Sequence, residues 1–128
     1  MADGSILAFD FGLQRIGVAV GNTLMCQARP LLVIATPSND AKFAAIEQLL
    51  KEWQPQLCVV GLPLHPDGAE HEMTKRCRRF AHQLEGRFGV TTELVDERYS
   101  SAVLNAKRGQ VIDADAAAII LQQYFDQA

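Results

Sequence analysis

The sequence has few cysteines and no long apolar run. Its 128 residues include three cysteines, Cys26, Cys58 and Cys77, an odd number without the paired spacing of a metal site. Cys58 lies in an apolar run and Cys77 on an apolar helical stripe, so both are predicted to be small buried residues. No segment approaches the ~18 consecutive apolar residues of a membrane span, and the first residues lack the features of a secretory signal. We therefore expect a protein of the reducing cytoplasm that does not enter a membrane.

The chain also lacks an excess of positive charge. It has 12 lysines and arginines against 15 aspartates and glutamates, for a net charge of −3. This balance excludes a protein that binds nucleic acid through overall charge alone, but it allows a local basic face. There is no dinucleotide-binding glycine motif and no P-loop. The length predicts a single domain, residues 1–128.

Hydrophobic periodicity predicts three strands followed by alternating helices and strands. Apolar and β-branched runs predict strands at 5–10, 16–20, 26–34, 57–60 and 92–96. Apolar residues at helical spacing predict helices at 40–53, 69–88 and 113–125. Short connections make the first three strands an antiparallel meander. The order βββαβαβα predicts an α/β domain whose mixed five-stranded sheet has helices on both faces.

Three acidic residues lie at the ends of apolar segments. They are Asp10 in ILAFDFG, Glu97 in ELVDER and Asp113 in VIDADAAAIIL. Ligands of open sheets bind at the carboxyl ends of strands, where Asp10 and Glu97 are predicted to lie. Carboxylate oxygens suit Mg²⁺ or Mn²⁺, and one or two such ions can activate water against a phosphodiester. If the three acids meet, they predict a metal-dependent enzyme acting on phosphate.

The first two acids also have structural interpretations. Asp10 precedes Phe11-Gly12 and fits a turn residue that hydrogen-bonds its own backbone. Asp96 and Glu97 are adjacent, so on a strand they point to opposite faces, and the pattern alone does not choose between them. A solvated strand end with Arg98 as partner is the alternative for this pair.

Helical phase is more informative for the third acid. On a helix, Asp113 shares a face with Ala117 and Leu121, the face expected to pack on the sheet, whereas Asp115 points away. The neighbouring alanines would allow the helix to approach the sheet closely. Asp113 also fits an N-cap, a role that is compatible with metal binding.

Basic residues cluster in two places. Phosphate contact is one interpretation of these clusters, and a solvated helix face is the other, because Glu70, Glu72 and Glu85 dilute the first cluster. The histidines at positions 65, 71 and 82 lack metal-ligand spacing and are expected to be surface or loop residues. The candidate phosphate contacts are Lys75, Arg76, Arg79, Lys107 and Arg108.

The chain resembles the YqgF/RuvX family of the RNase H-like superfamily. The matching segments, in order, are LAFDFG, IGVAVG, VVGLPL followed by DG, FGV, VDERYSS and IDADAAAIILQQYF. The resemblance implies an RNase H-like fold and a Holliday-junction-resolvase-like nuclease that processes the 5′ end of precursor 16S rRNA. It implies that Asp10, Glu97 and Asp113 bind the metal, which selects Glu97 over Asp96. It also implies that Arg98, Ser100 and Ser101 lie near the site.

The resemblance leaves the substrate and the oligomeric state open. Precursor RNA and branched DNA are both expected partners, and a homodimer is expected if a symmetric junction is cleaved, because that needs two sites. The segment 102–112 is about a dozen residues shorter than the family pattern implies, through natural deletion, engineered deletion or omission of disordered residues from the sequence. The difference bears on nucleic-acid affinity more than on metal binding. Tyr99 and the two serines also replace the leucine and threonines more usual in the family.

Two other functions compete with a nuclease. One is a catalytically weak nucleic-acid-binding factor of ribosome biogenesis. The other is an actin-like ATPase, whose first phosphate loop also joins two strands through an Asp-x-Gly turn. Such ATPases close two domains on the nucleotide, and 128 residues are too few for two such domains.

Overall fold

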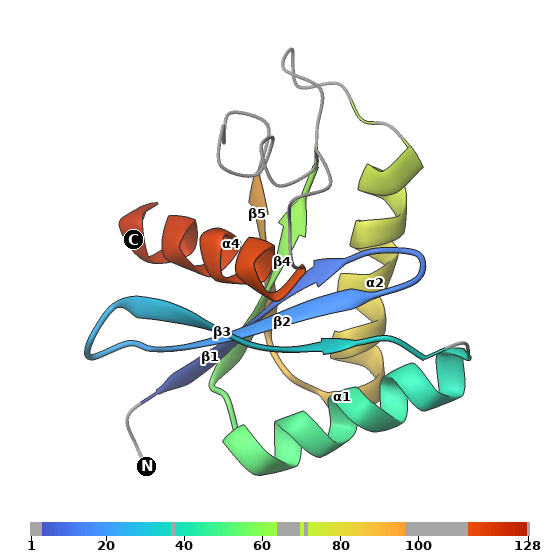
Figure 1. Cartoon of the computed structure of the whole chain (residues 1–128), viewed down its shortest axis with the longest axis horizontal. Helices are drawn as coiled ribbons and strands as arrows, with labels where there is room; N and C mark the ends of the chain where they lie inside the picture. The colour runs from blue at the N-terminus through green and yellow to red at the C-terminus, as the bar shows by residue number, and fades with distance from the viewer. Residues whose placement is uncertain (1–3, 37, 64–69, 71, 97–112, 128) are drawn as a thin grey trace.

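The computed structural model describes residues 4–36, 38–63, 70, 72–96 and 113–127, apart from the side chain of Asp113. Figure 1 shows the arrangement of the helices and strands. The described strands are β1 (Ser5–Phe11), β2 (Ile16–Asn22), β3 (Gln27–Ile34), β4 (Leu57–Leu62) and β5 (Thr92–Asp96). The described helices are α1 (Asn39–Trp53), α2 (Glu72–Phe88) and α4 (Asp113–Gln127).

The five strands form one mixed sheet in the order β3-β2-β1-β4-β5. The first three strands pair antiparallel as a meander, whereas β4 pairs parallel to β1, and β5 pairs parallel to β4. The expected α/β class, mixed sheet and order of elements are therefore confirmed. Because β1, β4 and β5 run parallel, their carboxyl ends lie at the same edge of the sheet.

Helices cover both faces of the sheet, as expected. Residues Leu7 and Phe9 of β1 pack in a core with α1 and α2 on one face. Ile6 and Ala8, which alternate with them, pack in a second core with α4 on the other face. All four side chains are at most 1% exposed, the pattern of a strand that is covered on both sides. In Figure 1, α4 crosses one face of the sheet and α2 lies behind the other.

The ends of the elements differ from the predicted ends by a few residues. The β1–β2 hairpin continues to the pairs Phe11↔Ile16 and Ser5↔Asn22, because backbone pairing persists beyond the apolar residues that mark a strand in sequence. Helix α1 begins at Asn39, since Ser38 caps it by accepting a hydrogen bond from the backbone N–H of Ala41. Helix α2 begins at Glu72, so the predicted start at residue 69 was too early.

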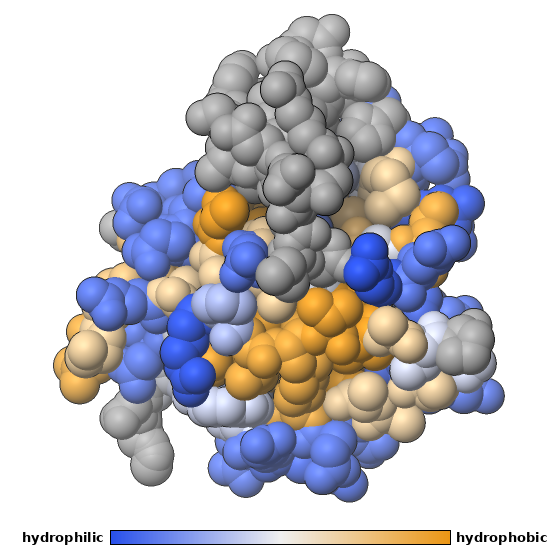
Figure 2. All heavy atoms as spheres, viewed as in Figure 1, coloured by the Kyte–Doolittle hydropathy of each residue, from blue (hydrophilic) through white to orange (hydrophobic). Residues whose placement is uncertain are grey.

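Apolar side chains also reach the surface near the edge strand β3. They gather in the middle of the face seen in Figure 2, where Figure 1 places β2 and β3 between α4 and α1. Leu32 of β3 is 39% exposed. No helix in the described ranges is long and apolar enough to cross a membrane.

Two glycines allow a matched test of packing. A Cβ on Gly21 of β2 would lie 2.7 Å from Phe125 of α4 and 2.9 Å from the backbone oxygen of Gln27, whereas a Cβ on Gly86 of α2 would meet nothing within 4 Å. We expect Gly21→Ala to lower the free energy of unfolding by about 1–3 kcal/mol through overpacking. We expect Gly86→Ala to raise it by roughly 0.5–1 kcal/mol through helix propensity. Urea denaturation measures both, and an unchanged or higher free energy of unfolding for Gly21→Ala would contradict the close contact of α4 with β2.

The cysteines give a second test, of burial. Cys58 and Cys77 are buried, as expected, and Cys26 is exposed. Burial raises the pKa of the Cys58 thiol to about 12, so the thiol stays protonated and unreactive at pH 8. We expect a thiol reagent to label Cys26 in the folded protein and to reach Cys58 only after unfolding. Peptide mapping after timed labelling measures this, and rapid native labelling of Cys58 would contradict the packing of β4.

Candidate functional site

Asp10 lies at the carboxyl end of the central strand. It is half-buried, and its backbone pairs with Gly17 of β2. Because Ile6 and Ala8 pack in the core beneath α4, strand alternation puts Asp10 on the same face. The next residue, Phe11, faces the other way and stacks on Phe80 of α2, with 4.7 Å between the ring centroids. The carboxylate therefore emerges on the α4 side of the sheet, at the edge where the parallel strands end.

The neighbours of Asp10 within the sheet are glycines. Gly17 lies beside it on β2. On the other side, Phe9 pairs with Val60, so the next position of β4 sets Gly61 beside Asp10. A glycine has no side chain to occupy the sheet surface. The two adjacent strands thus leave space on both flanks of the carboxylate.

An open pocket of about 430 Å³ adjoins Asp10. Most of its lining comes from the turn between β1 and β2, and Met73 of α2 completes it. Arg15 lines the same pocket, so a carboxylate and a guanidinium share one opening. The turn residues that line it are Gly12, Leu13, Gln14 and Arg15.

The pairing at the end of β5 shows which face of the sheet Asp96 occupies. Asp96 pairs with Leu62 of β4, which belongs to the core under α1 and α2. Its predecessor Val95 is 2% exposed and packs beneath α4. Asp96 therefore faces away from the α4 side, on which Asp10 lies. Glu97 lies outside the described residues, so the predicted choice of Glu97 stays a prediction.

Helix α4 has the phase that the sequence predicted. Ala117 and Leu121 are fully buried against the sheet, and Asp115 is exposed. The alanines at positions 114, 116 and 117 are buried too, as expected for a helix that approaches the sheet closely. The backbone of Asp113 forms the first residue of α4, but its side chain is outside the described part.

The first turn of α4 lies toward the Asp10 end of β1. Leu121 and Phe125 approach Gly21, which pairs with Ile6 near the start of β1. Asp113 precedes Leu121 by eight residues, a rise of about 12 Å along a helix. Ile6 and Asp10 are four residues apart, about 13 Å along a strand. These lengths match, and Figure 1 shows the start of α4 near the arrowhead of β1.

The basic residues predicted on α2 are partly neutralised. Arg76 pairs with Glu72 at 3.2 Å, and Arg78 pairs with Glu70, so the expected dilution by glutamates is confirmed for these two. Arg79 forms no ion pair or hydrogen bond among the described residues, and neither does Lys75. The remaining predicted contacts lie outside the described ranges: Arg98, Ser100, Ser101, Lys107 and Arg108.

One buried cation was missed in the sequence. Lys42 of α1 is 9% exposed and lines a second pocket together with Arg76 and Arg79. Its spacing gave a signal, since Lys42, Ile46 and Leu49 lie at i, i+4 and i+7 on one helical stripe. A lysine on an apolar stripe is usually predicted to lie at the exposed margin of that stripe, so the burial of Lys42 is evident only in the structure.

The metal site itself is not tested by the described residues. Among them, no group of three or more histidine, cysteine or acidic side chains could hold a metal ion. Of the three predicted ligands, only Asp10 has its side chain in that part of the chain. Metal binding by Asp10, Glu97 and Asp113 therefore stays a prediction.

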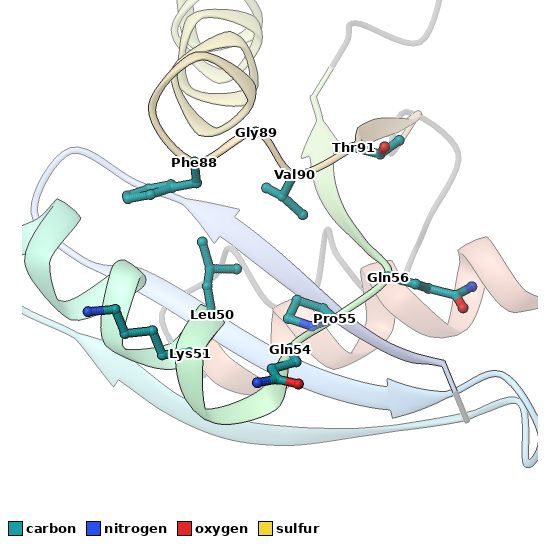
Figure 3. Close-up of a pocket in the computed structure, with 9 residues that line it drawn as sticks. All are labelled: Leu50, Lys51, Gln54, Pro55, Gln56, Phe88, Gly89, Val90 and Thr91. Atoms are coloured by element: carbon teal, nitrogen blue, oxygen red, sulfur yellow. The ribbon is translucent and has the colours of Figure 1, made fainter. Parts of the chain in front are cut away.

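A larger pocket lies at the opposite edge of the sheet. It has a volume of about 510 Å³ and lies between the ends of α1 and α2 and the starts of β4 and β5. In Figure 3, the apolar side chains Leu50, Phe88 and Val90 face one another, while Lys51 and Gln56 point outward. None of the described residues that line this pocket is a carboxylate, and the pocket is separated from Asp10 by the length of the strands.

Comparison with known proteins identifies close relatives. The family model for RuvX, described as Holliday junction resolvase, matches residues 4–127. A protein of Bordetella avium named "Putative pre-16S rRNA nuclease" is 56% identical over 129 residues, which cover 99% of this chain and 98% of the relative. A protein of Paraburkholderia phytofirmans with the same name is 51% identical over 130 residues, covering 97% and 89%. Neither alignment has room for an insertion of a dozen residues, so these two relatives do not show the expected shortening of 102–112.

Solved structures agree on the fold. RuvC of T. thermophilus, in complex with a Holliday junction substrate, matches with a TM-score of 0.62 at 18% identity, covering 97% of this chain and 94% of that chain. The fowlpox virus Holliday junction resolvase matches with a TM-score of 0.58 at 9% identity, covering 97% and 99%. Identities this low show the fold alone, and they confirm the RNase H-like fold expected from the sequence. Since the family model and the relatives span nearly the whole chain, the protein belongs to the RuvX family.

Proposed function

We propose that this chain is a metal-dependent endonuclease that hydrolyses phosphodiester bonds in structured nucleic acid. Its substrate is the 5′ end of precursor 16S rRNA, with Holliday-junction-like DNA as the second candidate. The observation that carries the proposal is the position of Asp10, which ends the central strand on the α4 face between two glycines. The names of the close relatives support RNA as the first candidate.

The described residues fit a hard divalent cation. Asp10 offers carboxylate oxygens, the donors that Mg²⁺ and Mn²⁺ prefer, and its glycine neighbours leave room for the water molecules that Mg²⁺ retains. Glu97 and Asp113 would complete the ligand set. When bound, the cation supplies an activated water and stabilises the charge that develops on the leaving oxygen.

The protein's own groups supply position and charge around the substrate. The first turn of α4 lies toward Asp10, and helix N-termini carry unpaired N–H groups and partial positive charge. These groups favour the carboxylates and a phosphate at this edge of the sheet. Arg15 lines the pocket beside Asp10, where its guanidinium can bind phosphate oxygens.

The two candidate substrates make different demands on the protein. A four-way DNA junction has two equivalent strands to cut, so its symmetric resolution needs two active sites and hence a homodimer. A single cut at the end of an RNA precursor needs one site. The proposal for RNA therefore holds for a monomer, and the proposal for junctions requires dimerisation.

The proposed function predicts that Asp10 is essential for cleavage. We expect Asp10→Asn to reduce Mn²⁺-dependent cleavage of a precursor 16S rRNA fragment by at least about 100-fold, because a neutral amide is a poor metal ligand. The matched control is Asp115→Asn, the same change at an exposed position of α4, which should keep the wild-type rate. The measurement is single-turnover cleavage of the RNA and of a four-way DNA junction, with and without Mn²⁺.

Three outcomes of that experiment would count against the nuclease. Cleavage without metal, or an unchanged rate for Asp10→Asn, would exclude the proposed site. If Asp10→Asn abolishes cleavage in vitro but both RNA binding and biological activity are retained, a weakly catalytic ribosome-biogenesis factor is favoured.

A separate prediction tests which of the adjacent residues Asp96 and Glu97 is the metal ligand. Asp96 faces the α1 and α2 side of the sheet, so we expect Asp96→Asn to leave Mn²⁺ affinity and cleavage within about threefold of wild type. We expect Glu97→Gln to lose at least about 100-fold in rate, as a ligand should. Manganese titration and cleavage kinetics measure both variants, with urea denaturation to verify folding. A larger loss for Asp96→Asn than for Glu97→Gln would identify Asp96 as the ligand instead of Glu97.

A further inference from the structure

A basic pocket lies on the other face of the sheet from Asp10, beside the same end of β1. It has a volume of about 280 Å³ and is formed by the β1–β2 turn, the start of α1 and the middle of α2. Among the described residues, the charged side chains that line it are all basic: Lys42, Arg76 and Arg79. Asn39 and Gln83 add polar groups. In a chain with a net charge of −3, this local concentration of positive charge predicts an anionic ligand. We call it the Lys42 pocket.

Lys42 is 9% exposed, and its ammonium group uses only part of its hydrogen-bonding capacity. Its Nζ donates to the backbone oxygen of Leu13 at 3.3 Å and lies 5.9 Å from the ring centroid of Phe11. No carboxylate among the described residues forms an ion pair with it. An ammonium has three donors, and a buried charge is costly unless it is paired. An anion in the pocket would provide the missing charge and accept the remaining donors.

The arginines of the pocket differ from their neighbour on α2. Arg78, which does not line the pocket, is paired with Glu70. Arg79 lines the pocket and has no hydrogen bond or ion pair within the described ranges, so its guanidinium is available. Arg76 contacts Glu72 through Nε, which leaves its terminal nitrogens for another acceptor. Two arginine forks and one lysine suit phosphate oxygens.

The surroundings strengthen binding of an anion. Phe11, Phe43 and Phe80 line the pocket, and a low-dielectric wall increases the attraction between charges. Asn39, in the first turn of α1, brings the positive end of the helix dipole to the rim. The pocket therefore combines one buried lysine and three aromatic side chains with two exposed arginines.

We propose that the Lys42 pocket binds a phosphate of the nucleic-acid backbone at a distance from the bond that is cut. This inference rests on the proposed function and adds a second contact to it. Leu13 lines both this pocket and the pocket at Asp10, and Asp10 and Phe11 are consecutive residues that face opposite sides. The strand of substrate passes around the β1–β2 turn, with one phosphate at Asp10 and another at Lys42.

The test is binding of RNA in the Asp10→Asn background, where no cleavage interferes. The probe is a fluorescein-labelled single-stranded RNA that spans the 5′ end of the 16S precursor, and anisotropy gives its Kd at several KCl concentrations. We expect Lys42→Met and Arg79→Gln each to weaken binding about tenfold and to reduce the salt slope by about one. Lys42→Met keeps an apolar stem of similar length, and Arg79 is exposed, so at least the second variant should fold normally.

The matched control is Lys51→Gln. Lys51 lies in the last turn of the same helix as Lys42, is 70% exposed and pairs with Glu47. Removing its charge should leave the Kd within about twofold and the salt slope unchanged. If Lys42→Met and Arg79→Gln behave like this control, the pocket does not bind phosphate.

Two further measurements define the contact. In the active protein, Arg79→Gln should raise the KM for RNA cleavage and leave kcat unchanged, since the pocket lies away from the reacting bond; a fall in kcat alone would overturn the assignment. The pocket variants should lose the same affinity for RNA that carries a 5′-phosphate as for RNA that carries a 5′-hydroxyl. A loss confined to the 5′-phosphorylated RNA would overturn the backbone contact in favour of a terminal-phosphate site.

The experiment also separates this inference from the proposed function. If the wild type cleaves the RNA and the Asp10→Asn protein binds it, but the pocket variants match Lys51→Gln, only the second contact fails. If the wild type neither cleaves nor binds the RNA, the proposed function fails and the inference fails with it.

Discussion

Parallel pairing of β1, β4 and β5 is the constraint on which the rest of the molecule depends. Four consecutive residues of β1, from Ile6 to Phe9, are at most 1% exposed, and burying an aliphatic or aromatic side chain contributes about 1.5–3 kcal/mol. A strand buried on both faces must be central, with helices above and below. Its carboxyl end then meets those of its parallel neighbours, and Asp10 is the first ionisable side chain to emerge there.

Strand alternation assigns different chemistry to the two faces at this edge. Asp10 emerges beneath α4 between Gly17 and Gly61, where a carboxylate has space around it. Phe11 emerges on the opposite face, where its ring stacks on Phe80 and lies under the ammonium of Lys42. One residue of β1 thus serves the proposed metal site, and the next helps to form a basic pocket. The β1–β2 turn joins the two pockets, which suits a ligand longer than one nucleotide.

Much of this arrangement follows from residue pattern. Period-two and helical repeats predicted the order of elements, and the phase of α4 predicted both the burial of Ala117 and the exposure of Asp115. Pattern did not choose between Asp96 and Glu97, because adjacent strand residues differ only in face. The face follows from register, through the pairing of Asp96 with Leu62. Lys42 was missed because burial of a cation depends on Leu13 and Phe11, which are far from it in sequence.

The central claim is that Asp10, Glu97 and Asp113 form one divalent-cation site at this sheet edge. Binding of Mn²⁺, measured by electron paramagnetic resonance of the free ion, tests it without relying on activity. Wild type and Asp115→Asn should bind Mn²⁺ with the same affinity, whereas Asp10→Asn, Glu97→Gln and Asp113→Asn should each weaken binding at least about tenfold. Equal Mn²⁺ affinity in all five proteins, with each folded normally, would contradict the shared site.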